Sequence, residues 1–222
     1  MAEESLTRKA ALFDMDRTLV RIDTGTLYVR YQRDRGEATW RDAARVAWWM
    51  LQYSFGVVDA ERVAARALES FRGKEEAWLE KACEELFSGY VQKHVANAGR
   101  AAVERHRAAG DLVGIVTGAT PYVALPLARA LSIEHVVATR LEVEDGRFTG
   151  RVAPPMSYGK GKILLAERLA EQQGFALKEA TFYSDSITDL PLLEHVQTPV
   201  VVNPDRRLRS IARSRGWRIE SW

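Results

Sequence analysis

Short runs of apolar and β-branched residues recur along the chain, and segments with helical apolar spacing lie between them. Such runs are typical of strands buried on both faces, as in a parallel sheet. The predicted strands are Ala10 to Phe13, Leu112 to Val116, Pro199 to Val202 and, shorter, Thr181 to Tyr183. The predicted helices are about Asn97 to Ala109, Pro121 to Leu131, Lys162 to Gln173 and Asp205 to Arg215. This alternation is that of βαβ units.

Two stretches depart from the alternation. Leu141 to Val152 alternates in character around Asp145-Gly146, a dipeptide that supplies the positive φ values of a tight turn, and predicts a β-hairpin. From Thr24 to Val95 the pattern shows no convincing strand, only amphipathic helical patterns broken by glycines. We therefore predict an α/β protein in which residues 1–22 and 96–222 form a parallel-sheet core and residues 23–95 form an inserted helical cap domain.

Charge and composition exclude several classes of protein. Lys and Arg number 32 and Asp and Glu 30, and this near balance disfavours a nucleic-acid binder, which needs clustered positive charge. The longest apolar stretches are shorter than the roughly 20 residues that cross a bilayer, and the N-terminus shows no signal peptide. Cys83 is the single cysteine, which rules out an internal disulfide. A cytoplasmic protein is expected.

Acidic residues follow two of the predicted strands. Asp14 and Asp16 come directly after the first strand, and Asp185 and Asp189 follow Thr181 to Tyr183. Ligands of open α/β sheets bind beyond the carboxyl ends of the strands, so these side chains are expected to meet at one site. Carboxylates gathered in this way repel one another unless they take up a proton or a hard cation such as Mg²⁺. The pattern indicates a magnesium site.

A favourable place for an anion lies at the end of Leu112 to Val116, the predicted strand that comes between these acidic motifs in the sequence. Thr117 and Gly118 end that strand, immediately before a helix opened by Pro121, where free N–H groups and the helix dipole attract negative charge. With a lysine nearby, such a site suits phosphoryl transfer, with one carboxylate as nucleophile and another as general acid and base. Each piece alone is more often a turn or a helix cap, and it is their order along the chain that favours chemistry.

Four ordered motifs from Asp14 to Asp189 resemble those of the haloacid dehalogenase superfamily of phosphohydrolases, in the branch similar to phosphoserine phosphatase. Asp14-Met-Asp16-Arg-Thr18 is similar to the Asp-x-Asp-x-Thr signature of that family. The resemblance implies a Rossmann-like core, with Asp14 as the nucleophile that becomes phosphorylated and Asp16 as general acid and base. It also implies that Thr117 and the Gly118 amide bind the transferred phosphoryl group.

The third motif is a lysine, for which Gly159-Lys-Gly-Lys-Ile offers Lys160 and Lys162. The spacing of Lys162 from Asp185 matches phosphoserine phosphatase-like members, so Lys162 is preferred as the cation that holds nucleophile and phosphoryl group together. The fourth motif contains Asp185 and Asp189.

By the same resemblance, Asp185 binds Mg²⁺ alongside the Asp14 side chain and the Asp16 backbone carbonyl. Asp189 is expected to orient the loop or the lysine.

Two departures bear on the substrate. Phosphoserine phosphatases usually have Glu where this chain has Asp23 and Asn where it has Thr188, and the resemblance implies that these residues contact the leaving group. Both changes weaken the case for phosphoserine itself. Trp40 to Tyr53 carries three of the six tryptophans; cap packing is the favoured interpretation, and an apolar substrate pocket or a peripheral lipid contact is the alternative.

The predicted function is Mg²⁺-dependent hydrolysis of a small phosphomonoester through an aspartyl-phosphate on Asp14, by a monomer or homodimer. The expected partner is a small phosphorylated metabolite, such as an amino-alcohol phosphate, phosphoserine, a sugar phosphate or a lipid head-group phosphate. Three alternatives stay open: a phosphotransferase, a lipid head-group phosphatase, and a catalytically idle regulatory binding module with the same fold.

Overall fold

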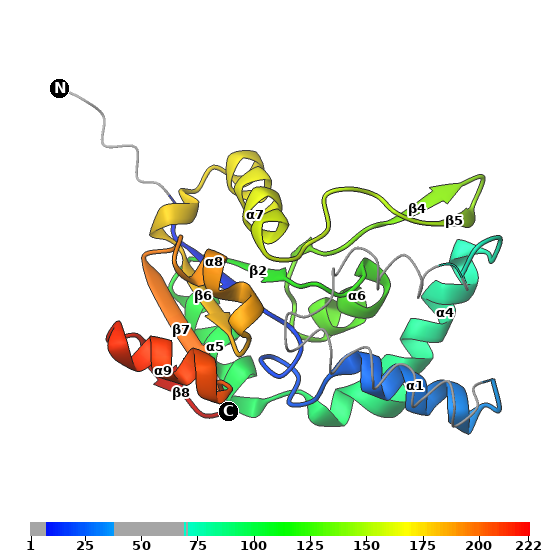
Figure 1. Cartoon of the computed structure of the whole chain (residues 1–222), viewed down its shortest axis with the longest axis horizontal. Coiled ribbons are helices and arrows are strands. Elements are labelled where there is room, and N and C mark those ends of the chain that lie inside the picture. The colour runs from blue at the N-terminus through cyan, green and yellow to red at the C-terminus, as the bar shows by residue number, and fades with distance from the viewer. Residues whose placement is uncertain (1–7, 38–68, 70) are drawn as a thin grey trace.

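A computed structural model describes residues 8–37, 69 and 71–222 and contains a six-stranded sheet (Figure 1). Every neighbouring pair of its strands is parallel, in the order β3-β2-β1-β6-β7-β8. The strands are β1 (Ala10–Phe13), β2 (Leu112–Val116), β3 (His135–Val137), β6 (Thr181–Ser184), β7 (Thr198–Val202) and β8 (Arg218–Glu220). The prediction of an α/β core with a parallel sheet is confirmed, and β1 and β2 have the predicted bounds.

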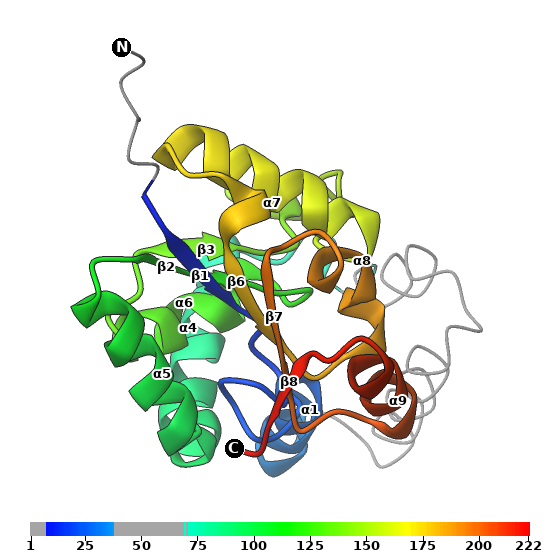
Figure 2. The same cartoon turned by 90° about the vertical axis from the view of Figure 1, so that its left-hand side faces the viewer.

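Helices cover both faces of this sheet (Figure 2). One face carries α5 (Asn97–Ala108) and α6 (Pro121–Ala130); the other carries α7 (Lys160–Gln173), α8 (Leu190–Leu193) and α9 (Arg206–Ser214). Short 3₁₀ turns, η3 (Leu177–Glu179) and η4 (Ile187–Asp189), flank β6. All residues of β1 are buried, because alternate side chains enter the two hydrophobic clusters on opposite faces of the sheet.

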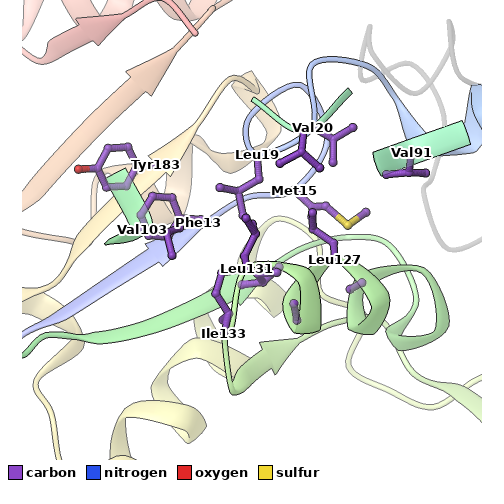
Figure 3. Packing of buried hydrophobic residues seen from close by; sticks show 14 of the residues in the cluster. Phe13, Met15, Leu19, Val20, Val91, Val103, Leu127, Leu131, Ile133 and Tyr183 are labelled. Atoms are coloured by element: carbon purple, nitrogen blue, oxygen red, sulfur yellow. The ribbon is translucent and has the colours of Figure 1, made fainter. Parts of the chain in front are cut away.

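The first of these clusters extends beyond the sheet toward the inserted region (Figure 3). Phe13 and Tyr183 stack with ring centroids 4.5 Å apart beneath the strands. From there the cluster continues through Met15 and Leu19 to Val91. Because Met15 lies between Asp14 and Asp16 and Leu19 directly follows the first motif, packing fixes the loop that carries the two aspartates.

The described part of the insertion is helical. It contains α1 (Thr24–Asp34), α4 (Glu76–Leu86), a π-helical turn η1 (Phe87–Val91) and a 3₁₀ turn η2 (Gln92–His94). The segment from Trp40 to Tyr53 lies outside the described residues. The predicted boundaries of a separate cap, 23–95, therefore stay a prediction.

The chain leaves and re-enters the core through two paired segments. Val20 pairs with Val95 in an antiparallel bridge. On either side of it, the Arg21 amide donates to the His94 carbonyl at 2.9 Å and the Ala96 amide to the Leu19 carbonyl at 2.8 Å. These hydrogen bonds hold together the start and the end of the insertion.

The predicted hairpin is confirmed as β4 (Leu141–Glu144) paired with β5 (Arg147–Val152). Its turn residues Asp145 and Gly146 have φ values of 50° and 73°, as a tight hairpin turn requires. Among the described residues, no helix is long and apolar enough to cross a membrane.

Candidate active site

The three chemical motifs that follow β1, β2 and β6 lie at one edge of the sheet. Asp14, Thr117 and Asp185 come directly after these adjacent strands. Phe13, the last residue of β1, pairs with Ile115 on one side and Tyr183 on the other. The parallel register therefore places all three residues at the carboxyl ends of the strands, where α/β folds bind their ligands.

Lys162 joins two of the acidic residues. Its Nζ lies 2.8 Å from Asp14 Oδ1, and 2.8 and 2.7 Å from the two carboxylate oxygens of Asp189. The side chain of Lys162 is 3% exposed, whereas Lys160 is on the surface at the start of the same helix. Burial alone would lower the pKa of Lys162, but the two carboxylates raise it, so the ammonium keeps its charge.

Asp189 is itself held by a buried hydroxyl. Ser184 Oγ donates to Asp189 Oδ2 at 2.7 Å and accepts from the Ser186 amide at 3.1 Å. Asp189 thus contacts both Lys162 and Ser184, and its expected role in orienting the loop or the lysine stays a prediction. Sequence reasoning gave Ser184 no role, although its place at the end of a buried strand next to Asp185 was the available signal.

Asp16 is half-buried and connects the core to the insertion. Its Oδ1 accepts from the amide of Thr24, the first residue of α1, at 2.7 Å. Burial, followed by the charges of Asp23 and Asp14, raises the pKa of Asp16 to about 8. A carboxylic acid with this pKa holds its proton near neutral pH, which is the state that a general acid requires.

The remaining carboxylates show an excess of negative charge. Burial raises the pKa of Asp14 to about 6, although Lys162 acts in the opposite direction. The pKa of Asp185 is raised well above its ordinary value by burial and then by the charges of Asp14 and Asp189. A cation placed between Asp14 and Asp185 would relieve this repulsion.

The donor atoms here fit Mg²⁺. Two carboxylates, on Asp14 and Asp185, and the Asp16 carbonyl are hard oxygen ligands, and Mg²⁺ takes few of these and completes its shell with water. Within the ranges that the structure describes, no group of three or more His, Cys, Asp and Glu side chains is arranged as a metal site.

The other residues singled out from the sequence lie nearby or are engaged locally. Thr117 is buried, and its Oγ1 accepts from the Ala119 amide at 3.2 Å, while Gly118 is exposed. Asp23 caps α1 by accepting from the Thr26 amide at 3.0 Å. The hydroxyl of Thr188 lies 2.8 Å from that of Ser186. The contacts of Asp23 and Thr188 are structural, and their roles toward a substrate stay predictions.

Comparison with known proteins agrees with this geometry. The model of the haloacid dehalogenase-like hydrolase family matches residues 11–194, which include all four motifs. The chain belongs to the haloacid dehalogenase-like hydrolases. The family inferred from the motif order is thereby confirmed.

Haloacid dehalogenase-like relatives cover nearly the whole chain. Phosphoserine phosphatase SerB1 of Mycobacterium tuberculosis is 36% identical over 218 residues, which are 96% of this chain and 70% of SerB1. Histidinol-phosphatase of Neisseria meningitidis is 28% identical, over 96% of this chain and 98% of that protein. A solved structure of a Bordetella pertussis protein of unknown function superposes with a TM-score of 0.88, at 34% identity over 96% and 98% of the two chains. The prediction of a phosphatase of the phosphoserine phosphatase-like branch is confirmed.

Proposed function

We propose that this phosphatase hydrolyses a small phosphomonoester in a Mg²⁺-dependent reaction, through an aspartyl-phosphate on Asp14. The observation that carries the proposal is the buried contact of Asp14 with Lys162, next to a carboxylic acid, Asp16, whose pKa is raised to about 8. One group is held as an anion by a fixed cation, and the other is kept protonated. A nucleophile and a general acid require these two states.

In the first half of the reaction, an oxygen of Asp14 attacks phosphorus and the bond from phosphorus to the leaving oxygen breaks. Asp16 gives its proton to that oxygen, so the leaving group departs as a neutral alcohol. In the second half, Asp16 takes a proton from water while the water oxygen attacks phosphorus. The acyl-phosphate bond breaks, inorganic phosphate is released and Asp14 is restored.

The other residues hold these groups in place. Lys162 contacts the Asp14 carboxylate from the side of α7. Thr117 and the Gly118 amide would donate to the phosphoryl oxygens. Mg²⁺ bound by Asp14, Asp185 and the Asp16 carbonyl would supply positive charge to the phosphoryl group.

The charges around Asp16 bear on the leaving group. Asp23 is close enough to raise the pKa of Asp16, so two acidic groups lie where the alcohol departs. This favours a leaving group that carries an amine over one that is anionic throughout. The names of the relatives, a phosphoserine phosphatase and a histidinol-phosphatase, support a small amino-alcohol or amino-acid phosphate.

The test is turnover of p-nitrophenyl phosphate and of a panel of small phosphomonoesters with Mg²⁺. Asp14→Asn should abolish turnover on every ester, because an amide is not a nucleophile for phosphorus. Asp145→Asn makes the same chemical change at the exposed hairpin turn and should leave turnover unchanged. Near-normal activity of Asp14→Asn would overturn the covalent mechanism.

Two further measurements separate the alternatives. Asp16→Asn should slow turnover, and full activity of this variant would remove its acid and base role. Product analysis with an added acceptor alcohol distinguishes hydrolysis from phosphotransfer: a new phosphoester, rather than inorganic phosphate alone, would show a phosphotransferase. Absence of turnover across the whole panel would favour an idle binding module.

A further inference from the structure

Arg17 occupies an unusual position in the first motif. From Ala10 to Val20 it is the one exposed residue, and its backbone φ is 56°, in the left-handed region that favours glycine. The turn is closed by the Val20 amide, which donates to the Met15 carbonyl at 2.9 Å. The fold therefore holds an arginine, under backbone strain, at the tip of the loop that carries Asp14 and Asp16.

The tip lies beside the fourth motif. Phe13 of β1 pairs with Tyr183 of β6, and the Asp14 amide donates to the Tyr183 carbonyl at 2.8 Å, so the loop that carries Arg17 begins beside the strand that leads to Asp185. The positive charge of Arg17 acts on Asp185 and lowers its pKa against the larger effect of burial. In the part of the chain that the structure describes, the Arg17 guanidinium forms no hydrogen bond and no ion pair with protein.

The four ionised carboxylates of the site exceed by one the positive charge of Lys162 together with a bound Mg²⁺. Lys162 is the one buried Lys or Arg among the described residues, and its three contacts, with Asp14 and Asp189, match the three N–H donors of an ammonium. In this arrangement all three N–H groups of Lys162 face carboxylate oxygens. Besides Asp16, which holds its proton, four aspartates lie here: Asp14, Asp23, Asp185 and Asp189. An anionic phosphomonoester that approaches them is repelled unless another cation receives it.

We infer that Arg17 binds an oxyanion of the phosphomonoester and thereby sets the affinity of the site for its substrate. Arg17 is exposed next to Asp16, on the loop that carries the first motif, and offers five N–H donors in a planar fork that matches carboxylate and phosphate oxygens. The oxyanion belongs either to the transferred phosphoryl group or to a carboxylate on the leaving group. The inference rests on the proposed function, because it assigns a role within the same reaction.

The kinetic test compares Arg17→Gln and Arg17→Lys with Arg21→Gln. Arg21 is exposed on the same segment, and its side chain contacts only the Lys93 carbonyl, at 3.4 Å, among described groups. Arg17→Gln should raise KM about tenfold or more, the effect of one charge-assisted hydrogen bond, and change kcat by less than about twofold. Arg17→Lys should recover part of the affinity. Arg21→Gln, which removes the same charge, should leave KM unchanged.

Two substrates locate the oxyanion. The organic part of p-nitrophenyl phosphate carries no carboxylate, whereas that of phosphoserine carries one. A rise in KM for both shows that Arg17 binds the phosphoryl group, and a rise for phosphoserine alone shows that it binds the carboxylate. An unchanged KM for both, or an equal rise in Arg21→Gln, overturns the inference.

A binding measurement keeps the inference separate from the proposed reaction. Titration calorimetry of Asp14→Asn and of the double variant Asp14→Asn/Arg17→Gln with the same two esters needs no turnover. If the wild type turns over nothing yet the double variant binds about tenfold more weakly, the proposed function fails and the inference stands. Equal dissociation constants for both proteins overturn the inference whatever the activity.

Arg17→Gly excludes a purely structural role. Glycine adopts the observed φ without strain, so this variant should be at least as stable toward denaturant as the wild type. Its affinity for the ester should nevertheless fall as it does in Arg17→Gln. A less stable Arg17→Gly protein with unchanged affinity would show that the arginine serves the fold, and would overturn the inference.

Discussion

Lys162 Nζ lies 2.8 Å from Asp14 Oδ1, although the two residues are 148 positions apart in the sequence. The contact joins the first turn of α7 to the end of β1, and Asp189 accepts from the same ammonium. The buried ammonium and the two buried carboxylates therefore compensate one another's charge. Removal of any member leaves the charge of another without compensation.

Lys162→Met should abolish turnover and lower the free energy of unfolding by about 3 to 5 kcal/mol at neutral pH. The reason is that Asp14 and Asp189 would stay buried without their cation. Urea denaturation and p-nitrophenyl phosphate turnover measure the two effects. Lys160→Met is the matched control, since Lys160 is exposed two residues away, and it should change neither. Equal stability of the two variants would contradict the importance assigned to the buried contact.

Gly161 makes the placement of Lys162 possible. A Cβ on Gly161 would collide with the carbonyl oxygen of Met156, so the first turn of α7 packs directly on the loop before it. Gly161→Ala should therefore displace that turn and lower kcat by at least about tenfold, because misplacement of a catalytic group by about 1 Å is enough for a large loss. Gly174→Ala, at the other end of α7, is the control. Its φ of 69° makes it destabilising, yet the Cβ meets open space, so the kcat of its folded fraction should be unchanged.

The elements that sequence patterns predicted best are those in which one physical requirement dominates. β1 and β2 are buried along their whole length, so they are uninterrupted apolar runs, and the Asp145-Gly146 turn needs the positive φ that its residues provide. β3 and β8 were missed because they are three-residue edge strands. Their exposed side admits residues such as His135 and Arg218, which leave no apolar run.

Of the site residues, too, some could be predicted from the sequence pattern and others could not. The position of Asp14 after a buried strand was visible in the pattern, but the choice between Lys160 and Lys162 came from family spacing. Helical periodicity does not say which lysine of a first turn points inward. The hydrogen bond from Ser184 to Asp189 was not predicted, since a serine at the end of a strand is compatible with many roles.

Mg²⁺ should stabilise the protein more at alkaline than at acid pH. Burial raises the folded-state pKa of Asp14 to about 6 and of Asp16 to about 8. For acids whose pKa is raised on folding, the stabilisation is fully present below their unfolded pKa of about 4 and is lost as pH rises through the folded values. The metal-free protein should therefore lose stability between about pH 5 and pH 9. In this range Mg²⁺ would offset the repulsion between the ionised carboxylates.

Thermal denaturation with EDTA or Mg²⁺, at about pH 5.5 and about pH 8.5, measures this effect. The increase in Tm with Mg²⁺ should be larger at the higher pH. Asp185→Asn should remove most of the increase. The same increase at both pH values would contradict the linkage between these carboxylates and the cation.

Two backbone pairings join the described part of the insertion to the rest of the protein. The first is the pairing of Val20 with Val95, and the second is with the hairpin of β4 and β5. The Gly73 amide donates to the Phe148 carbonyl at 2.8 Å, and the Phe148 amide donates to the Lys74 carbonyl at 3.0 Å. With the antiparallel bridge between Glu75 and Arg147, these hydrogen bonds join the segment before α4 to β5. Phe148 is 2% exposed and packs in a small cluster with Leu79 of α4. This cluster is separate from the two that flank the sheet.

Phe148→Ala should therefore loosen α4 while the sheet stays folded, although Ala82 and Leu86 of α4 also pack in the first cluster. Loss of a buried phenylalanine costs about 3 to 5 kcal/mol, which is more than a small satellite cluster can supply. Hydrogen exchange should show lost protection in Glu76–Leu86 and retained protection in Ala10–Phe13. KM should rise because Asp16 is bonded to the insertion through Thr24. Phe175→Ala, in the cluster on the opposite face of the sheet, should weaken the core and α4 together. If Phe148→Ala behaves in the same way, the hairpin and α4 are not a separate cooperative unit.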